Sequence, residues 1–133
     1  MKKTKLINSE ISYEIAKMGH FDKMAIADSG LPIPQGVKRI DLAVTAGVPG
    51  FMEVLEAVLS ELIVQKVTIA SEMREMNPVL YKSLSEMMLN ERTVLEEIPH
   101  DEFKKRTNSV VAVVRTGEAR PYANIILESN VVF

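Results

Sequence analysis

The chain has 133 residues, of which 47% are hydrophobic and 26% are charged, and its net charge is −2. This composition excludes a disordered chain, the length suits one domain, and the weak charge without a basic tract argues against a nucleic-acid-binding protein. Cysteine is absent, which excludes disulfides and thiolate chemistry and is compatible with a reducing cytosol.

The amino-terminal segment lacks the pattern of a signal peptide. Lys2, Lys3 and Lys5 are followed by Asn8-Ser9-Glu10 rather than by a long apolar stretch and a cleavage site. No run elsewhere approaches the roughly 20 apolar residues of a membrane span. We therefore expect a soluble protein that is located in the cytoplasm.

The first half of the chain predicts two helices and two strands. Apolar residues share one helical face between a cap at Asn8 or Ser9 and a helix end at Gly19. The elements predicted after this helix are a buried strand over 23–27, a structured loop over 29–36, a strand over 39–44 and an amphipathic helix over 51–62.

The second half continues this alternation. Asn77 and Pro78 have the pattern of a helix start, a capping amide before a proline. A strand is predicted over 63–70, before this helix, which continues to 88. The elements predicted after the helix are a strand over 94–98, a short polar helix from 99, a strand over 110–114, and short strands over 124–127 and 131–133. Together they predict an α/β fold: a single three-layer domain over residues 1–133, with a mainly parallel central sheet flanked by helices.

Two polar residues flank the first predicted strand. His20 has the side chain that both takes and gives a proton near neutral pH, although a cation at a helix end is an alternative role. Asp28 follows the strand, where the crevice of an open α/β sheet lies. The alternative for Asp28 is a cap of the Ser29-Gly30 turn.

A second group of polar candidates lies in the last third of the chain. His100 could lie in the first turn of an exposed helix, Tyr122 could be edge packing, and Asn124 could be a turn former. The separation between the two histidines is not that of a metal site. The glycine patterns of phosphate-binding loops and the Gly-x-Ser-x-Gly elbow are absent.

Four motifs follow one another in a specific order: Gly19-His20-Phe21-Asp22, Ala27-Asp28-Ser29-Gly30-Leu31-Pro32-Ile33-Pro34, Arg39-Ile40-Asp41-Leu42-Ala43 and Pro121-Tyr122-Ala123-Asn124-Ile125-Ile126-Leu127. With Asn8-Ser9 and Arg115-Thr116-Gly117-Glu118 they resemble the D-ribose pyranase / L-fucose mutarotase family from the amino terminus to Phe133. The family pattern more often has Thr at Phe21 and Ala at Ser29. We expect neither difference to touch a chemical group of the site.

This resemblance implies a cofactor-free isomerase that interconverts the pyranose and furanose forms of D-ribose by acid/base-catalysed ring opening and reclosure. His20 would be the catalytic proton donor and acceptor, with Asp28 orienting it, and no metal would be bound. The residues that would bind the sugar are Asp28, His100, Tyr122, Ala123 and Asn124, with Lys104 as a further candidate. A mutarotase of another aldose such as L-fucose, and a non-catalytic sugar-binding or regulatory protein, remain alternatives.

The resemblance also implies a homo-oligomer, commonly a decameric ring, with sites close to subunit boundaries. In such a ring Tyr122 and Asn124 would reach the His100 of a neighbouring chain. The apolar terminus, Val131-Val132-Phe133, would either join the sheet of its own chain or be buried between subunits.

Overall fold

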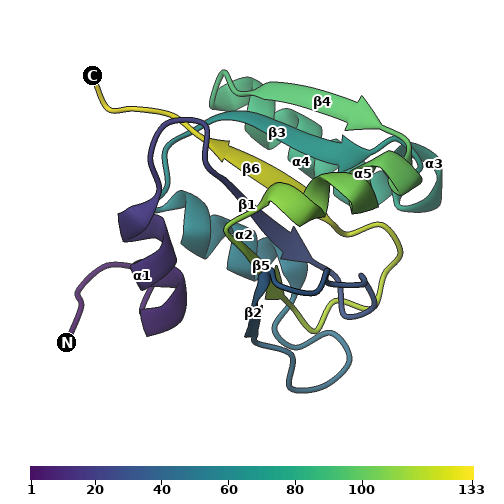
Figure 1. The fold of residues 1–133 in the computed structure, drawn as a ribbon. Helices are drawn as coiled ribbons and strands as arrows, with labels where there is room; N and C mark the ends of the chain where they lie inside the picture. The colour runs from purple at the N-terminus through teal and green to yellow at the C-terminus, as the bar shows by residue number, and fades with distance from the viewer.

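The computed structural model describes residues 1–133 and contains one six-stranded sheet with helices on both faces (Figure 1). The strands are β1 (Lys23–Ala27), β2 (Lys38–Asp41), β3 (Val64–Ala70), β4 (Val94–Ile98), β5 (Ala112–Arg115) and β6 (Ile125–Ser129). The helices are α1 (Ser9–Lys17), α2 (Phe51–Leu59), α3 (Met73–Met76), α4 (Pro78–Asn90) and α5 (His100–Arg106), and a 3₁₀ turn, η1, covers Thr107–Ser109.

The strand order is β2-β5-β1-β6-β3-β4. Strand β6 is antiparallel to both of its neighbours, and the other three pairings are parallel. The carboxyl ends of five strands and the amino end of β6 therefore lie at one edge, which we call the carboxyl edge; the opposite one is the amino edge. The prediction of a mainly parallel sheet is confirmed.

Two apolar clusters cover the two faces of the sheet. In β1, Met24 and Ile26 belong to a cluster of 21 buried residues, whereas Ala25 and Ala27 belong to a second cluster of eight. This alternation is that of a central strand buried on both sides. Helices α1, α2 and α4 contribute to the larger cluster and α5 covers the other face, so the three-layer prediction is confirmed (Figure 1).

Most predicted elements occur within a few residues of their expected bounds. Helix α1 begins after Asn8, whose Oδ1 accepts a hydrogen bond from the Ile11 amide at 2.9 Å, as a helix cap does. Helix α3 was not predicted, because four residues are too few to show a periodic pattern. None of the helices has the length and apolar character needed to cross a bilayer.

The predicted strand over 131–133 is wrong. Strand β6 ends at Ser129, which is paired with Val64, the first residue of β3. Asn130 donates the last backbone hydrogen bond, to Ile63 at 3.0 Å, and no neighbouring strand continues beyond it. The tail therefore leaves the sheet, with Val132 and Phe133 exposed (Figure 1).

Candidate functional site

Asp28 and Asn124 form a carboxylate–amide pair at the carboxyl edge. They meet because Asp28 follows β1 and Asn124 precedes β6, its antiparallel neighbour. The amide of Asn124 donates to Asp28 Oδ2 at 2.8 Å, and Asn124 Oδ1 accepts from the Asp28 backbone at 2.9 Å. Asp28 Oδ1 also accepts from the Gly30 amide at 2.9 Å. Asp28 thus caps its turn. Its half-buried carboxylate still has unused lone pairs that can accept hydrogen bonds from hydroxyl groups.

His100 and Tyr122 come together at the same edge. Their rings meet edge to face, with centroids 5.0 Å apart and planes at 89°. The backbone amide of His100 donates to the two carboxylate oxygens of Glu72 at 3.1 and 3.0 Å, which fixes the start of α5. The Nδ1 of His100 is buried without a hydrogen-bond partner. A buried polar atom of this kind is rare unless a ligand or water completes its bonding, which makes this nitrogen a candidate contact for a ligand.

The backbone that carries Tyr122 is strained and tethered. Tyr122 has a φ of 56°, a left-handed conformation that is uncommon for a bulky residue and is found at functional sites. The preceding carbonyl, of Pro121, accepts from the Asn77 side-chain amide at 3.0 Å. Ala123 is fully buried in the larger cluster, backbone included, so the structure leaves no part of it open to a ligand.

Glu118 anchors the loop that leads to Tyr122. Its buried carboxylate accepts from the backbone of Phe51, Ala119 and Arg120 and from the Arg120 guanidinium at 2.8 and 2.9 Å. The Arg120 side chain lowers the pKa of Glu118, against the effect of burial, to about 2 with the help of the backbone donors. Sequence reasoning did not find this role, because a Glu two residues before an Arg gives no signal of burial.

The same loop passes close to the segment before α2. A β-carbon at Gly117 would overlap the carbonyl oxygens of Val48 and Thr45. Only glycine allows this approach, so Gly117 lets the loop reach the carboxylate contacts of Glu118.

Lys104 lies one turn after His100 on α5. Its ammonium pairs with Asp101 of the same helix at 2.7 Å, and the Asp101 side chain is exposed. An exposed pair of this kind contributes little energy. The carboxyl-edge cluster therefore consists of Asp28, His100, Tyr122 and Asn124, and Lys104 lies beside it.

His20 lies at the opposite, amino edge of the sheet. It precedes β1, whereas Asp28 follows it, and the five residues of that strand span about 16 Å. The expectation that Asp28 orients His20 is wrong within one chain, because a strand separates them. Within one chain Tyr122 already meets its own His100, and the expected contact with the His100 of a neighbouring chain stays a prediction.

The surroundings of His20 include two residues that sequence reasoning did not assign to the site. The Nε2 of His20 lies 3.0 Å from Gln65 Oε1. The Phe21 ring stacks on the imidazole with centroids 3.8 Å apart and planes at 18°. The expectation that Phe21 touches no chemical group is therefore wrong.

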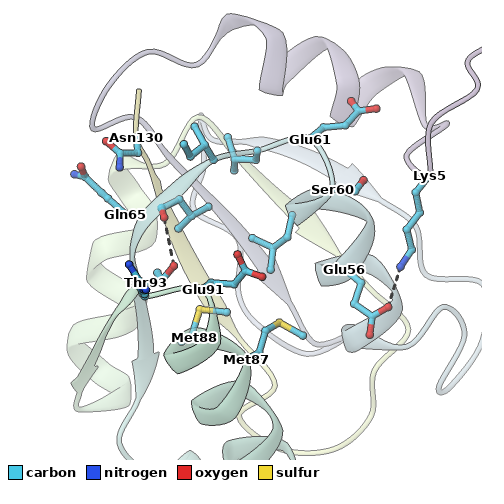
Figure 2. A pocket seen from close by; sticks show the side chains of 15 residues that line it. Lys5, Glu56, Ser60, Glu61, Gln65, Met87, Met88, Glu91, Thr93 and Asn130 are labelled. Atoms are coloured by element: carbon cyan, nitrogen blue, oxygen red, sulfur yellow. Dashed lines mark hydrogen bonds and ion pairs between the residues drawn. The ribbon is translucent and has the colours of Figure 1, made fainter. Parts of the chain in front are cut away.

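Two hollows lie at the amino edge. One, of about 860 Å³, reaches from Gln65 and Asn130 to the Lys5–Glu56 ion pair (Figure 2). The other, of about 280 Å³, is lined by His20 and the carboxyl-terminal tail. Neither hollow includes a residue of the carboxyl-edge cluster. His, Cys, Asp and Glu side chains do not gather anywhere in a set of three that could hold a metal ion.

Comparisons with known proteins cover the whole chain. Residues 1–132 match the RbsD / FucU transport protein family. The chain is 56% identical to the D-ribose pyranase of Enterococcus faecalis and 55% identical to that of Coprothermobacter proteolyticus, with 100% of each chain covered. The structure of Bacillus subtilis RbsD complexed with D-ribose has a TM-score of 0.95 at 41% identity, again with 100% of both chains covered. The fucose mutarotase of Streptococcus pneumoniae in complex with L-fucose, at 23% identity and a TM-score of 0.78, shares the fold.

Proposed function

The chain belongs to the RbsD / FucU transport protein family, and from this membership we propose that it is a cofactor-independent isomerase that interconverts the pyranose and furanose forms of D-ribose. Relatives more than half identical over their full length bear the name D-ribose pyranase. The observation on the molecule that carries the proposal is the carboxyl-edge cluster. It groups a half-buried carboxylate, a phenol and an unpaired imidazole nitrogen with the buried Asn124 amide that holds the carboxylate, and this set of donors and acceptors suits a ligand rich in hydroxyl groups.

The reaction needs only proton transfers. A proton leaves the anomeric hydroxyl while the bond between C1 and the ring oxygen breaks and that oxygen takes a proton. The open aldehyde rotates, and the C4 hydroxyl adds to C1 to give the five-membered ring, losing its proton while the carbonyl oxygen takes one. No electrons enter or leave the sugar. A positioned acid or base contributes on the order of 10²–10⁴-fold to such a step.

In this proposal the two edges of the sheet have different tasks. Asp28, His100, Tyr122 and Asn124 bind the hydroxyls and the ring, with Ala123 fixed between Tyr122 and Asn124 and Lys104 at the border of the site. His20 donates and accepts the proton at the ring oxygen or the anomeric hydroxyl. Because His20 lies at the amino edge of its own chain, we propose that the His20 of a neighbouring chain completes each site.

Exposed apolar side chains around His20 support such an assembly. Phe21, Ile63, Val132 and Phe133 are all exposed at the amino edge, where a neighbouring chain would cover them. The contact would join the amino edge of one chain to the carboxyl edge of the next. Contacts of this head-to-tail type form rings when the rotation between neighbouring chains closes. The proposed assembly is a homo-oligomeric ring, a decamer, that acts in the cytoplasm.

Saturation-transfer NMR on D-ribose tests the proposed activity. The protein should accelerate exchange between the pyranose and furanose signals, and His20→Ala should abolish the acceleration while ribose binding, measured by calorimetry, persists. Binding without any acceleration would replace the isomerase with a sugar-binding protein. The same spectra recorded with L-fucose separate a ribose isomerase from a mutarotase of another aldose.

A further inference from the structure

A chain of hydrogen bonds leads from His20 into the sheet. Gln65 Oε1 lies 3.0 Å from His20 Nε2, and the Gln65 amide nitrogen donates to Glu128 Oε1 at 2.8 Å. Glu128 is buried between its cross-strand neighbours Lys23 and Lys66, whose ammonium groups lie 3.2 and 3.5 Å from its other oxygen. The three side chains form a continuous series from the exposed imidazole to a buried carboxylate.

The charge of Glu128 fixes the direction of every bond in this series. Burial by itself would raise the pKa of Glu128, but the hydrogen bonds from Gln65 and Lys23 and the charges of Lys66 and Lys23 hold it below its ordinary value. An ionised carboxylate only accepts hydrogen bonds. Gln65 must therefore turn its NH₂ group toward Glu128 and its oxygen toward His20. Since that oxygen is an acceptor, the Nε2 of His20 must carry a proton.

A β-bulge aims Gln65 in this direction. Ser129 of β6 pairs with Val64 of β3, and the next residue of β6, Glu128, pairs with Lys66. One step along β6 therefore corresponds to two steps along β3. Gln65 is the extra residue. In a regular strand its side chain would point to the face opposite Lys66 and Glu128, whereas a bulge re-aims a side chain locally. Figure 2 shows Gln65 at the border of the larger hollow.

Building on the proposed function, we propose that Gln65 and Glu128 are positioning residues that hold His20 in the Nε2–H tautomer, which makes Nδ1 the nitrogen that exchanges protons with the sugar. The Nδ1 lone pair of neutral His20 takes a proton from a sugar hydroxyl, and the Nδ1–H of the imidazolium returns it to a sugar oxygen. The proton on Nε2 stays there throughout and is donated in a hydrogen bond to Gln65 Oε1. The stacked Phe21 ring holds the plane of the imidazole while this happens.

Nitrogen NMR of the ring resonances reads the tautomer directly. The chain has only two histidines, so ¹⁵N-labelled histidine gives two ring systems, and His20→Ala identifies one of them. In the neutral form, His20 should show a bare Nδ1 and a protonated Nε2. Gln65→Lys replaces the accepting Oε1 with a donating ammonium group, so His20 should then show a bare Nε2 and a protonated Nδ1. Glu128→Gln removes the carboxylate that fixes the orientation of the Gln65 amide, so His20 should populate both tautomers.

Glu96→Gln is the matched control. Glu96 is another carboxylate in the sheet and also lies near Lys66, at 3.9 Å, but its hydrogen bonds go to Thr68 and Arg106 and not toward His20. This variant should leave the His20 tautomer and the exchange rate unchanged. A wild-type His20 with a protonated Nδ1, or a tautomer that Gln65→Lys and Glu128→Gln leave unchanged, would overturn the inference.

Kinetics separate a positioning role from a structural one. Glu128→Gln should lower kcat about three- to tenfold and Gln65→Lys about 100-fold, with KM changed less than about twofold. Equal losses in the Glu96→Gln control would assign the effect to general destabilisation and overturn the positioning role. If the wild-type protein showed no ribose exchange, the proposed function would fail, while the tautomer spectra would still decide what Gln65 and Glu128 do to His20.

Discussion

The Glu118→Gln substitution should destabilise the protein in a pH-dependent manner. The substitution keeps the size of the side chain but removes the negative charge that holds the loop before Tyr122. In the folded protein Glu118 accepts hydrogen bonds from three backbone amides and from the Arg120 guanidinium. The Phe51 amide among them is at the start of α2, where a negative charge also interacts favourably with the helix dipole.

The size of the effect follows from the pKa of Glu118. This pKa falls from 4.5 to about 2 in the folded protein, and each unit is worth about 1.4 kcal/mol, so the carboxylate contributes at most about 3.5 kcal/mol at neutral pH. Solvent screens part of this contribution because the Arg120 side chain is half exposed, and we expect about 2 kcal/mol to remain. Because the folded-state pKa is lowered, the contribution is complete above pH 4.5 and is lost as the pH falls toward 2.

Urea unfolding at a series of pH values measures this contribution. The difference in unfolding free energy between wild type and Glu118→Gln should be about 2 kcal/mol at pH 7 and should shrink steadily below pH 4.5. The protein concentration must be fixed, since the stability of an oligomer depends on it. Glu56→Gln, which removes an exposed pair with Lys5, should cost less than about 1 kcal/mol at any pH. A Glu118→Gln difference that stays constant between pH 7 and 3 would refute the pKa argument.

Four other changes have expected outcomes at the proposed site. His20→Ala should slow D-ribose exchange at least about 100-fold in NMR while calorimetry shows retained binding; exchange near the wild-type rate would remove His20 from catalysis. Asp28→Asn should weaken ribose binding about tenfold or more in calorimetry, since it takes an ionised acceptor from the cluster. Tyr122→Phe should weaken binding about three- to tenfold with smaller effects on turnover, and unchanged affinity would show that its hydroxyl faces no sugar. Deletion of 131–133 should lower both the mass seen by light scattering and the activity, and a fully active monomer would contradict the assembly.

The sequence was informative where local pattern decides structure. The apolar run at 23–27 is β1 with the predicted bounds, because a fully buried strand needs apolar residues on both faces. The Asn8 cap and the start of α4 at Pro78 were also predictable, since they depend on neighbours in the chain. The expectation of a capping amide at Asn77 is wrong, because this side chain makes no cap hydrogen bond and donates to the Pro121 carbonyl instead. The tail at 131–133 is equally apolar, but it could form a strand only if β3 extended far enough to pair with it. Strand β3 begins at Val64, opposite Ser129, and the sequence of the tail gives no information about that position.

The site was predictable residue by residue but not in its arrangement. Asp28 and Asn124 meet because β1 and β6 are antiparallel neighbours, and strand order cannot be read from local periodicity. His20 and Asp28 are close in sequence yet lie at opposite edges, since an extended strand separates its ends. Gln65 depends on a bulge, a one-residue shift in register that leaves no mark in composition.

Complementation between two impaired variants, assayed at a ribose concentration well below the Kd of the Asp28 variant, tests the shared site most directly. His20→Ala and Asp28→Ala would be unfolded, mixed in equal amounts and refolded together, and D-ribose exchange would be followed by saturation-transfer NMR. If each site takes His20 from one chain and Asp28 from another, about one quarter of the sites in mixed rings are intact. Exchange should then recover to about one quarter of the wild-type rate. Mixed assemblies that remain as inactive as the separately refolded variants would contradict a site built from two chains.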